Sequence, residues 1–181
     1  MNAIKSIGVF GGSATGNESA YVENAALFGK KLALRRITMN YGAGQTGVVG
    51  AAAKACLDAG GKVIGFINDY LNEREPFNFP LSDLKIYAQM HERKDALFNA
   101  SDAFCVLPGG LGTLDEVVEV MVLKQINEHN KPIVFYNPNG FWNPLKSCVD
   151  SFIQTQFAKK TDAGLAVYAD GIEQVFAGLG I

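Results

Sequence analysis

Short apolar runs alternate with longer amphipathic segments along the whole chain, and this alternation constrains the fold more than any other feature. In the first third of the chain we expect strands at Ile4–Phe10, Ile37–Tyr41 and Lys62–Ile67 and helices at Glu18–Arg36 and Val48–Ala59. Strands that are apolar on both faces and connected by helices form parallel sheets covered on both sides. The pattern therefore predicts an α/β fold, a Rossmann-like doubly wound parallel sheet, in a single domain over residues 1–181.

The same pattern continues through the rest of the chain. Tyr70–Pro80 is rich in proline, asparagine and charge and is predicted to be a loop, and a weaker strand follows at Leu84–Tyr87. The remaining predicted elements are helices at His91–Asn99, Thr113–Glu128 and Pro144–Phe157, strands at Ala103–Leu107, Pro132–Tyr136 and Leu165–Tyr168, and a short closing helix. Sheets of this class bind ligands at the carboxyl ends of their strands, near the point where the strand order reverses.

The composition excludes several classes of function. Because 16 Lys and Arg against 18 Asp and Glu give a net charge of −2 without a basic block, we expect no nucleic-acid partner. No apolar run reaches the ~20 residues that span a bilayer, and the first residues lack the apolar core of a signal peptide, so we expect a cytoplasmic protein with no membrane contact. Three widely spaced cysteines and two distant histidines form no ligand pattern, so we expect no metal.

Glycine makes up 20 of the 181 residues, against a usual background of about 7%. Three clusters follow predicted strands: Gly11-Gly12, Gly42-x-Gly44-x-x-Gly47 and Gly109-Gly110-x-Gly112. At a junction between strand and helix, glycine lets backbone N–H groups face a ligand, and the helix N-terminus favours an anion. Three such loops at one edge of a sheet predict a site for a phosphorylated small molecule.

The first two loops allow more than one interpretation. In the first, Asn17-Glu18 stand where an ATP-binding P-loop needs Lys-Ser/Thr, so we exclude that class, and Ser13 either donates to a phosphate or caps a helix. The second loop fits G-x-G-x-x-G, and Asp69 lies about 20 residues further on, where a ribose-binding acid is expected. This spacing keeps a dinucleotide-dependent oxidoreductase as an alternative, but the motif is short and common in glycine-rich chains, and the fingerprint usually follows the first strand.

The third loop carries the residues that indicate chemistry. Thr113 adds a hydroxyl group at a helix N-terminus, and Glu116 follows one turn later on the face directed back at the ligand. Because a carboxylate repels phosphate, its presence there indicates a catalytic role, whereas Asp115 fits an acid that stabilises the first turn of a helix. Upstream, Arg93 and Lys94 lie near the start of another helix, a position that favours contact with the ligand over a solvated pair of charges.

Together, Met90-x-x-Arg93-Lys94 and Pro108-Gly-Gly-x-Gly-Thr-x-x-Glu116 closely resemble the signature of the LOG (LONELY GUY) family. Its members are cytokinin riboside 5′-monophosphate phosphoribohydrolases, formerly described as lysine decarboxylases. The resemblance extends over nearly the whole chain, from Phe10-Gly11-Gly12-Ser13 through Arg74-Glu75 to Gly140-x-x-Asn143-Pro144-Leu145.

The resemblance implies hydrolysis of the N-glycosidic bond of a nucleoside 5′-monophosphate, AMP or N6-prenylated AMP, to a free base and ribose 5-phosphate, without a cofactor. It implies that Arg93 and Glu116 are the catalytic residues. The residues implied to bind the substrate are Ser13, Glu75, Met90, Lys94, Gly109, Gly110, Gly112 and Thr113. It also implies a homodimer with the site near the subunit interface, and the apolar helix Val117–Ile126 offers a contact surface.

One departure from the family pattern and one alternative function stand beside this activity. Val122-Leu123 stand where the family usually has Thr-Trp, which concerns the preferred base more than the reaction. The chain also resembles molybdenum-cofactor carrier proteins of the same fold, so a non-catalytic nucleotide- or molybdenum-cofactor-binding protein is the alternative function. A lysine decarboxylase needs a lysine that forms a Schiff base with pyridoxal phosphate. The nearest candidate, Lys94, lies inside the nucleotide motif, so we exclude that activity.

Overall fold

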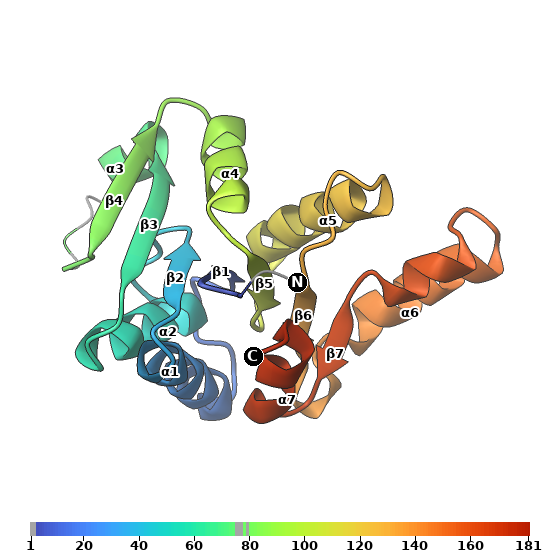
Figure 1. Ribbon diagram of the computed structural model, residues 1–181, viewed down its shortest axis with the longest axis horizontal. Coiled ribbons are helices and arrows are strands. Elements are labelled where there is room, and N and C mark those ends of the chain that lie inside the picture. Colours follow the sequence, from blue (N-terminus) through green and yellow to red (C-terminus); the bar gives the residue numbers. More distant parts are fainter. Residues whose placement is uncertain (1–2, 75–77, 79) are drawn as a thin grey trace.

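The computed structural model describes residues 3–74, 78 and 80–181, which form a parallel sheet between two layers of helices (Figure 1). In this part of the chain the sheet has seven strands in the order β4-β3-β2-β1-β5-β6-β7, all paired in parallel. The strands are β1 (Ser6–Phe10), β2 (Thr38–Tyr41), β3 (Val63–Asn68), β4 (Asp83–Tyr87), β5 (Ala103–Val106), β6 (Ile133–Tyr136) and β7 (Val167–Ala169). The predicted fold class is confirmed.

The helices divide between the two faces of the sheet, as Figure 1 shows for α1, α2 and α7 against α4 and α5. The first face carries α1 (Ser19–Leu34), α2 (Gly47–Asp58) and α7 (Ile172–Leu179). The second face carries α4 (Met90–Asn99), α5 (Leu111–Gln125) and α6 (Asn143–Gln154). No helix within the described ranges is long and apolar enough to cross a membrane.

Alternate residues of the central strands pack into two hydrophobic clusters on opposite faces. In β1, Ile7 and Val9 join the cluster beneath α1, α2 and α7, whereas Phe10 joins the cluster beneath α4 and α5. In β6, Val134 and Phe135 divide in the same way. Burying each such side chain contributes about 1.5–3 kcal/mol to folding, so both faces of the sheet are stabilised by the helices that cover them.

The strand order reverses at β1, and this reversal positions the site. The chain passes outward through β2, β3 and β4 and then returns to place β5 on the other side of β1. At the carboxyl ends, the amide of Leu107 donates to the carbonyl of Phe10 at 2.8 Å, and the amide of Gly12 donates to the carbonyl of Pro108 at 3.0 Å. The loops after β1 and β5 are therefore held side by side at the switch point of the sheet.

Many of the predicted elements are present with their ends shifted by up to three residues, and two differences have a local cause. The segment predicted as a loop at Tyr70–Pro80 begins inside a short helix, α3 (Asp69–Arg74), because the side-chain oxygen of Asn68 accepts the amide of Leu71 at 3.2 Å and starts a helical turn. The strand predicted at Leu165–Tyr168 begins two residues later, as β7, because the 3-10 helix η2 (Lys160–Gly164) precedes it.

Candidate functional site

A cavity of about 560 Å³ opens at the carboxyl ends of β1, β2 and β5. The loops after these three strands all line it, and the start of α4 and the first turns of α5 complete its surface. The glycines that line it are Gly11, Gly12, Gly16, Gly42, Gly44, Gly109, Gly110 and Gly112. The three glycine-rich loops identified in the sequence thus meet at a single site, as expected for the carboxyl edge of a parallel sheet.

The loop between β5 and α5 brings a helix N-terminus to the cavity. Gly110 is the N-cap of α5, and Leu111 and Gly112 line the cavity beside Thr113, whose side chain is buried. Gly109 is packed so closely against Thr113 and the loop after β1 that a Cβ would collide with both, whereas a Cβ at Gly110 or Gly112 meets nothing within 4 Å. The first amides of a helix have no partner within it, so this end suits an anion.

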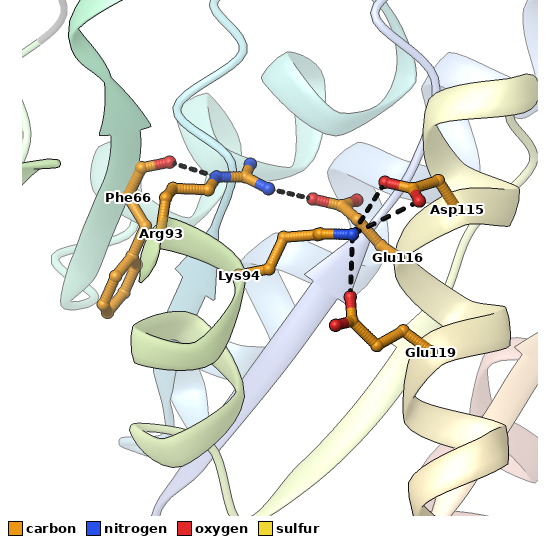
Figure 2. A network of polar contacts seen from close by, with 6 residues as sticks. All are labelled: Phe66, Arg93, Lys94, Asp115, Glu116 and Glu119. Atoms are coloured by element: carbon orange, nitrogen blue, oxygen red, sulfur yellow. Dashed lines mark hydrogen bonds and ion pairs between the residues drawn. The ribbon is translucent and has the colours of Figure 1, made fainter. Parts of the chain in front are cut away.

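Arg93 and Glu116 form an ion pair at the surface of the cavity (Figure 2). Arg93 extends from α4, where its Nε donates to the carbonyl oxygen of Phe66 at 2.9 Å and its Nη1 donates to Oε1 of Glu116 at 2.5 Å. The two side chains are only 7% and 15% exposed. One bond to the backbone and one to a carboxylate fix the guanidinium group in a single orientation.

Gly42 provides the space that this guanidinium group occupies. A Cβ at position 42 would collide with Nη2 of Arg93 and lie 3.6 Å from Oε1 of Glu116. The first glycine of the G-x-G-x-x-G sequence therefore allows an arginine side chain to approach the backbone closely.

The amides at the start of α2 are already used, which bears on the dinucleotide hypothesis. The amide of Val48 donates to the carbonyl of Ala14 at 3.2 Å, and the amide of Val49 donates to the carbonyl of Gly12 at 3.1 Å. Asp69, the predicted ribose-binding acid, does not line the cavity. A dinucleotide site of this kind needs its pyrophosphate at a free helix N-terminus, so the geometry does not support that hypothesis.

The electrostatic environment of Glu116 is set by burial and by its neighbours. Burial raises the pKa of the Glu116 carboxyl group above its ordinary value, and the Arg93 guanidinium group opposes this rise without cancelling it. An acidic neighbour, Asp115, raises this pKa further, and Lys94 lowers it. A carboxyl group of this kind, paired with a permanent cation and facing a cavity, is suited to stabilise positive charge or to accept a proton.

Comparison with known proteins decides the family. Residues 49–179 match the family model described as "Possible lysine decarboxylase". The chain is 36% identical over 171 residues to cytokinin riboside 5′-monophosphate phosphoribohydrolase LOG1 of Arabidopsis thaliana, which covers 94% of this chain and 80% of that protein. The chain belongs to the LOG family. A second LOG protein of Arabidopsis thaliana, the "Probable cytokinin riboside 5′-monophosphate phosphoribohydrolase LOG6", is 36% identical over 172 residues, 95% of this chain and 86% of its own.

Solved structures of other proteins share the fold of this LOG family member. The molybdenum cofactor (Moco) carrier protein of Chlamydomonas reinhardtii superposes with a TM-score of 0.73 at 20% identity, over 98% of this chain and 96% of that one. The molybdenum cofactor binding protein of Rippkaea orientalis gives a TM-score of 0.68 at 21% identity, over 98% and 96%. At these identities the likeness concerns the fold alone.

Most of the residues predicted from the LOG signature line the cavity. Ser13 and Met90 do so together with Arg93, Glu116, Thr113 and the three glycines of the third loop. Glu75 lies outside the described residues. Lys94 differs from the prediction: it does not line the cavity, because its ammonium group is bound by Asp115 and Glu119 of α5.

Two aromatic residues of the cavity were not predicted from the sequence. Tyr21 of α1 and Phe141, which precedes α6, line the cavity and contact each other edge to face with ring centroids 5.6 Å apart. Phe141 lies inside the segment Gly140-x-x-Asn143-Pro144-Leu145, which resembles the LOG family, but at a position that the motif leaves open. Aromatic residues in a sequence usually indicate core packing, so nothing in the sequence indicated that these two line a cavity.

Proposed function

We propose that this chain hydrolyses the N-glycosidic bond of a nucleoside 5′-monophosphate, AMP or N6-prenylated AMP, to the free base and ribose 5-phosphate. The observation that carries the proposal is the Arg93–Glu116 ion pair at the surface of a cavity that also receives the N-terminus of α5. The names of the relatives support it, since proteins about 36% identical over most of the chain are phosphoribohydrolases.

The phosphate group is assigned to the loop between β5 and α5. The first amides of α5, the Thr113 hydroxyl group and the Ser13 hydroxyl group supply donors on the same side of the cavity. Binding energy from this phosphate, which does not react, holds the glycosidic bond in place beside the ion pair.

Glu116 acts on the sugar in this mechanism. The bond between C1′ and the base nitrogen breaks with its electron pair leaving on the base, and the sugar passes through an oxocarbenium-like state. The Glu116 carboxylate stabilises that positive charge and accepts a proton from the water whose oxygen bonds to C1′. Glu116 then loses this proton to solvent water, and the departing base nitrogen takes up a proton from solvent to give the neutral free base.

Arg93 acts on the departing base and on Glu116. Its guanidinium group stays protonated at neutral pH, so it offers hydrogen bonds to the negative charge that develops on the base without transferring a proton. Its contact with Oε1 also favours the ionised form of Glu116, the form that the mechanism requires.

The test is release of base from AMP and N6-isopentenyl-AMP, measured by chromatography together with ribose 5-phosphate. Glu116→Gln keeps the size of the side chain and removes its charge, so we expect kcat to fall about 10²–10⁴-fold. Glu128→Gln is the matched control, because Glu128 is exposed beyond the last residue of α5 and should retain full activity. Nucleotide binding without base release by the wild type, or a Glu116→Gln variant as active as the wild type, overturns the proposal.

We also propose that the chain forms a homodimer through α5. Four apolar side chains of this helix and its last turn are exposed: Leu111 at 84%, Val118 at 42%, Val122 at 46% and Ile126 at 58%. Val118, Val122 and Ile126 recur at every fourth position and therefore share one face of the helix. Exposed apolar faces of this kind mark interaction surfaces, and light scattering should give twice the 19.4 kDa of one chain.

A further inference from the structure

Lys94 makes a second set of contacts between α4 and α5, beside the Arg93–Glu116 ion pair (Figure 2). Its ammonium nitrogen lies 3.2 Å from both carboxylate oxygens of Asp115 and 2.8 Å from Oε2 of Glu119. The Lys94 side chain is only 18% exposed, although it carries a full charge. It therefore bridges two carboxylates on successive turns of α5.

The two sets of contacts are aligned residue by residue. Arg93 and Lys94 are consecutive on α4, and Asp115 and Glu116 are consecutive on α5. Arg93 binds Glu116 at the cavity, and Lys94, which does not line the cavity, binds the neighbouring Asp115. Any shift of α5 along or away from α4 must break the Lys94 contacts as well as the Arg93 contact.

Apolar packing between the two helices is incomplete at this point. A hollow of about 20 Å³ lies between the two helices and is lined by residues of both, including members of the ion pairs. Its residues include Arg93, Lys94 and Phe98 of α4 and Glu116 and Leu123 of α5. Side chains that border a void make fewer van der Waals contacts, so the polar contacts contribute more to holding the two helices at this distance.

We propose that Lys94 is a positioning residue, which fixes α5 to α4 through Asp115 and Glu119 and so holds the Glu116 carboxylate against Arg93 at the cavity. Its kinetic consequences rest on the proposed hydrolase activity. Exposed ion pairs contribute little because solvent screens them. Lys94 is mostly buried and is bound by three oxygens of two side chains. Such a network of contacts holds a fixed geometry.

Lys94 also affects the charge balance at Glu116. Among the residues that the structure describes, the charged groups around this carboxylate come from the two helices, and the loops that line the cavity after β1 and β2 contribute glycine at Gly11, Gly12 and Gly42. These charged groups are Arg93, Lys94 and Asp95 of α4 and Asp115 and Glu119 of α5. The hydrogen bond to Glu119 raises the pKa of Lys94 itself, so its ammonium group stays charged across the working pH range.

Removing the charge of Lys94 has a predictable sign. Lys94 lowers the pKa of Glu116 and Asp115 raises it. Without Lys94, Arg93 is the one cation among the described neighbours of Glu116 that still lowers its pKa, so this pKa rises further. Because the mechanism requires the ionised carboxylate, the acidic limb of the pH profile must move to higher pH.

The experiment compares Lys94→Met, which keeps the length of the side chain but not its charge, with Lys94→Arg, which keeps the charge. For Lys94→Met we expect kcat to fall about 10- to 100-fold, as for small displacements of a catalytic group, with the acidic limb of the kcat profile moved to higher pH. The KM for AMP should stay within about twofold, because Lys94 does not line the cavity. Lys94→Arg should restore most of kcat and return the limb towards the wild-type position.

A higher KM with unchanged kcat in Lys94→Met would show that Lys94 binds the substrate, and unchanged kinetics would show an ordinary surface ion pair; either result overturns the proposal. If Lys94→Met does not fold, Glu119→Gln removes the negative charge from the 2.8 Å contact alone and should lower kcat by a smaller factor.

A second measurement is independent of hydrolysis. Carbon-13 labelling of the glutamate side chains allows the Glu116 carboxyl group to be titrated by NMR, with Glu116→Gln identifying its signal. We expect the Glu116 titration to move to higher pH in Lys94→Met and to remain close to wild type in Lys94→Arg. If the wild type releases no base but this shift is seen, the hydrolase proposal fails and the role of Lys94 stands. An unchanged Glu116 titration overturns the role of Lys94 whatever the activity.

Discussion

Replacing Gly42 with alanine tests whether the site depends on the position of the Arg93 guanidinium group. Gly42 has no positive φ angle, so alanine meets no backbone penalty there. Its Cβ would nevertheless overlap Nη2 of Arg93. To restore an ordinary van der Waals separation, the guanidinium group must move by roughly 1.5 Å, which is more than 1 Å.

The magnitude follows from the contacts that this movement breaks. A displacement of about 1 Å at a catalytic group costs about 100-fold in rate, which corresponds to about 2.7 kcal/mol of transition-state stabilisation. The hydrogen bond from Nε to the carbonyl of Phe66 is strained or lost as well, which costs about 1–3 kcal/mol of folding free energy. A domain of ordinary stability, about 5–15 kcal/mol, remains folded after such a loss.

The assay measures kcat/KM for AMP beside a thermal unfolding curve. We expect Gly42→Ala to lose about 100-fold in kcat/KM and to unfold at a lower temperature while keeping its circular dichroism spectrum. Gly164→Ala is the matched control, because a Cβ at Gly164 meets nothing within 4 Å and its φ is not positive. If Gly42→Ala has the activity and melting temperature of the wild type, the guanidinium group does not lie against Gly42 and the geometry is wrong.

Two further predictions concern the phosphate loop and the first strand. A Cβ at Gly112 meets nothing within 4 Å, so Gly112→Ala should melt at the same temperature as the wild type. If the loop binds phosphate, the added methyl group should raise the KM for AMP about tenfold. An unchanged KM would contradict the assignment of the phosphate to this loop. Asp102 accepts the amides of Lys5 and Ser6, both at 2.9 Å, so Asp102→Ala should lose about 1–2 kcal/mol of unfolding free energy at pH 7. Burial alone would raise the pKa of Asp102, but these hydrogen bonds lower it overall, so its contribution is present above about pH 4 and disappears as pH falls through the lowered pKa. Urea unfolding at pH 7 and pH 3 checks the sign, and a difference that persists undiminished at pH 3 would refute it.

Patterns that are local in the sequence predicted the fold and the location of the cavity. The division of Val134 and Phe135 between opposite faces follows from apolar strands alone. The meeting of the three glycine-rich loops follows because parallel strands end at the same edge. Glu116 could be singled out for the same reason, since a carboxylate beside an anion site needs an explanation other than binding.

Contacts between helices could not be predicted in the same way. The direction of Lys94 depends on how far α5 lies from α4, a distance that packing sets and that no periodicity records. Gly42 was assigned to a nucleotide fingerprint because the spacing matches, whereas its use is the space that Arg93 requires. Both contacts are hard to predict for the same reason: the partner lies far away in the sequence and on a different element.

The hydrogen bonds that tie α2 to the loop after β1 have a consequence for protein engineering. Val48 and Val49 donate to carbonyls of that loop, and the Thr46 hydroxyl group donates to the carbonyl of Ser13 at 3.0 Å. Chimeras that exchange the segment around Ser13 with that of a relative will inherit mismatched partners unless residues 42–49 are exchanged with it. The lining of this side of the cavity should therefore be exchanged as both loops together, and single-loop grafts should yield chains that fold with an altered cavity.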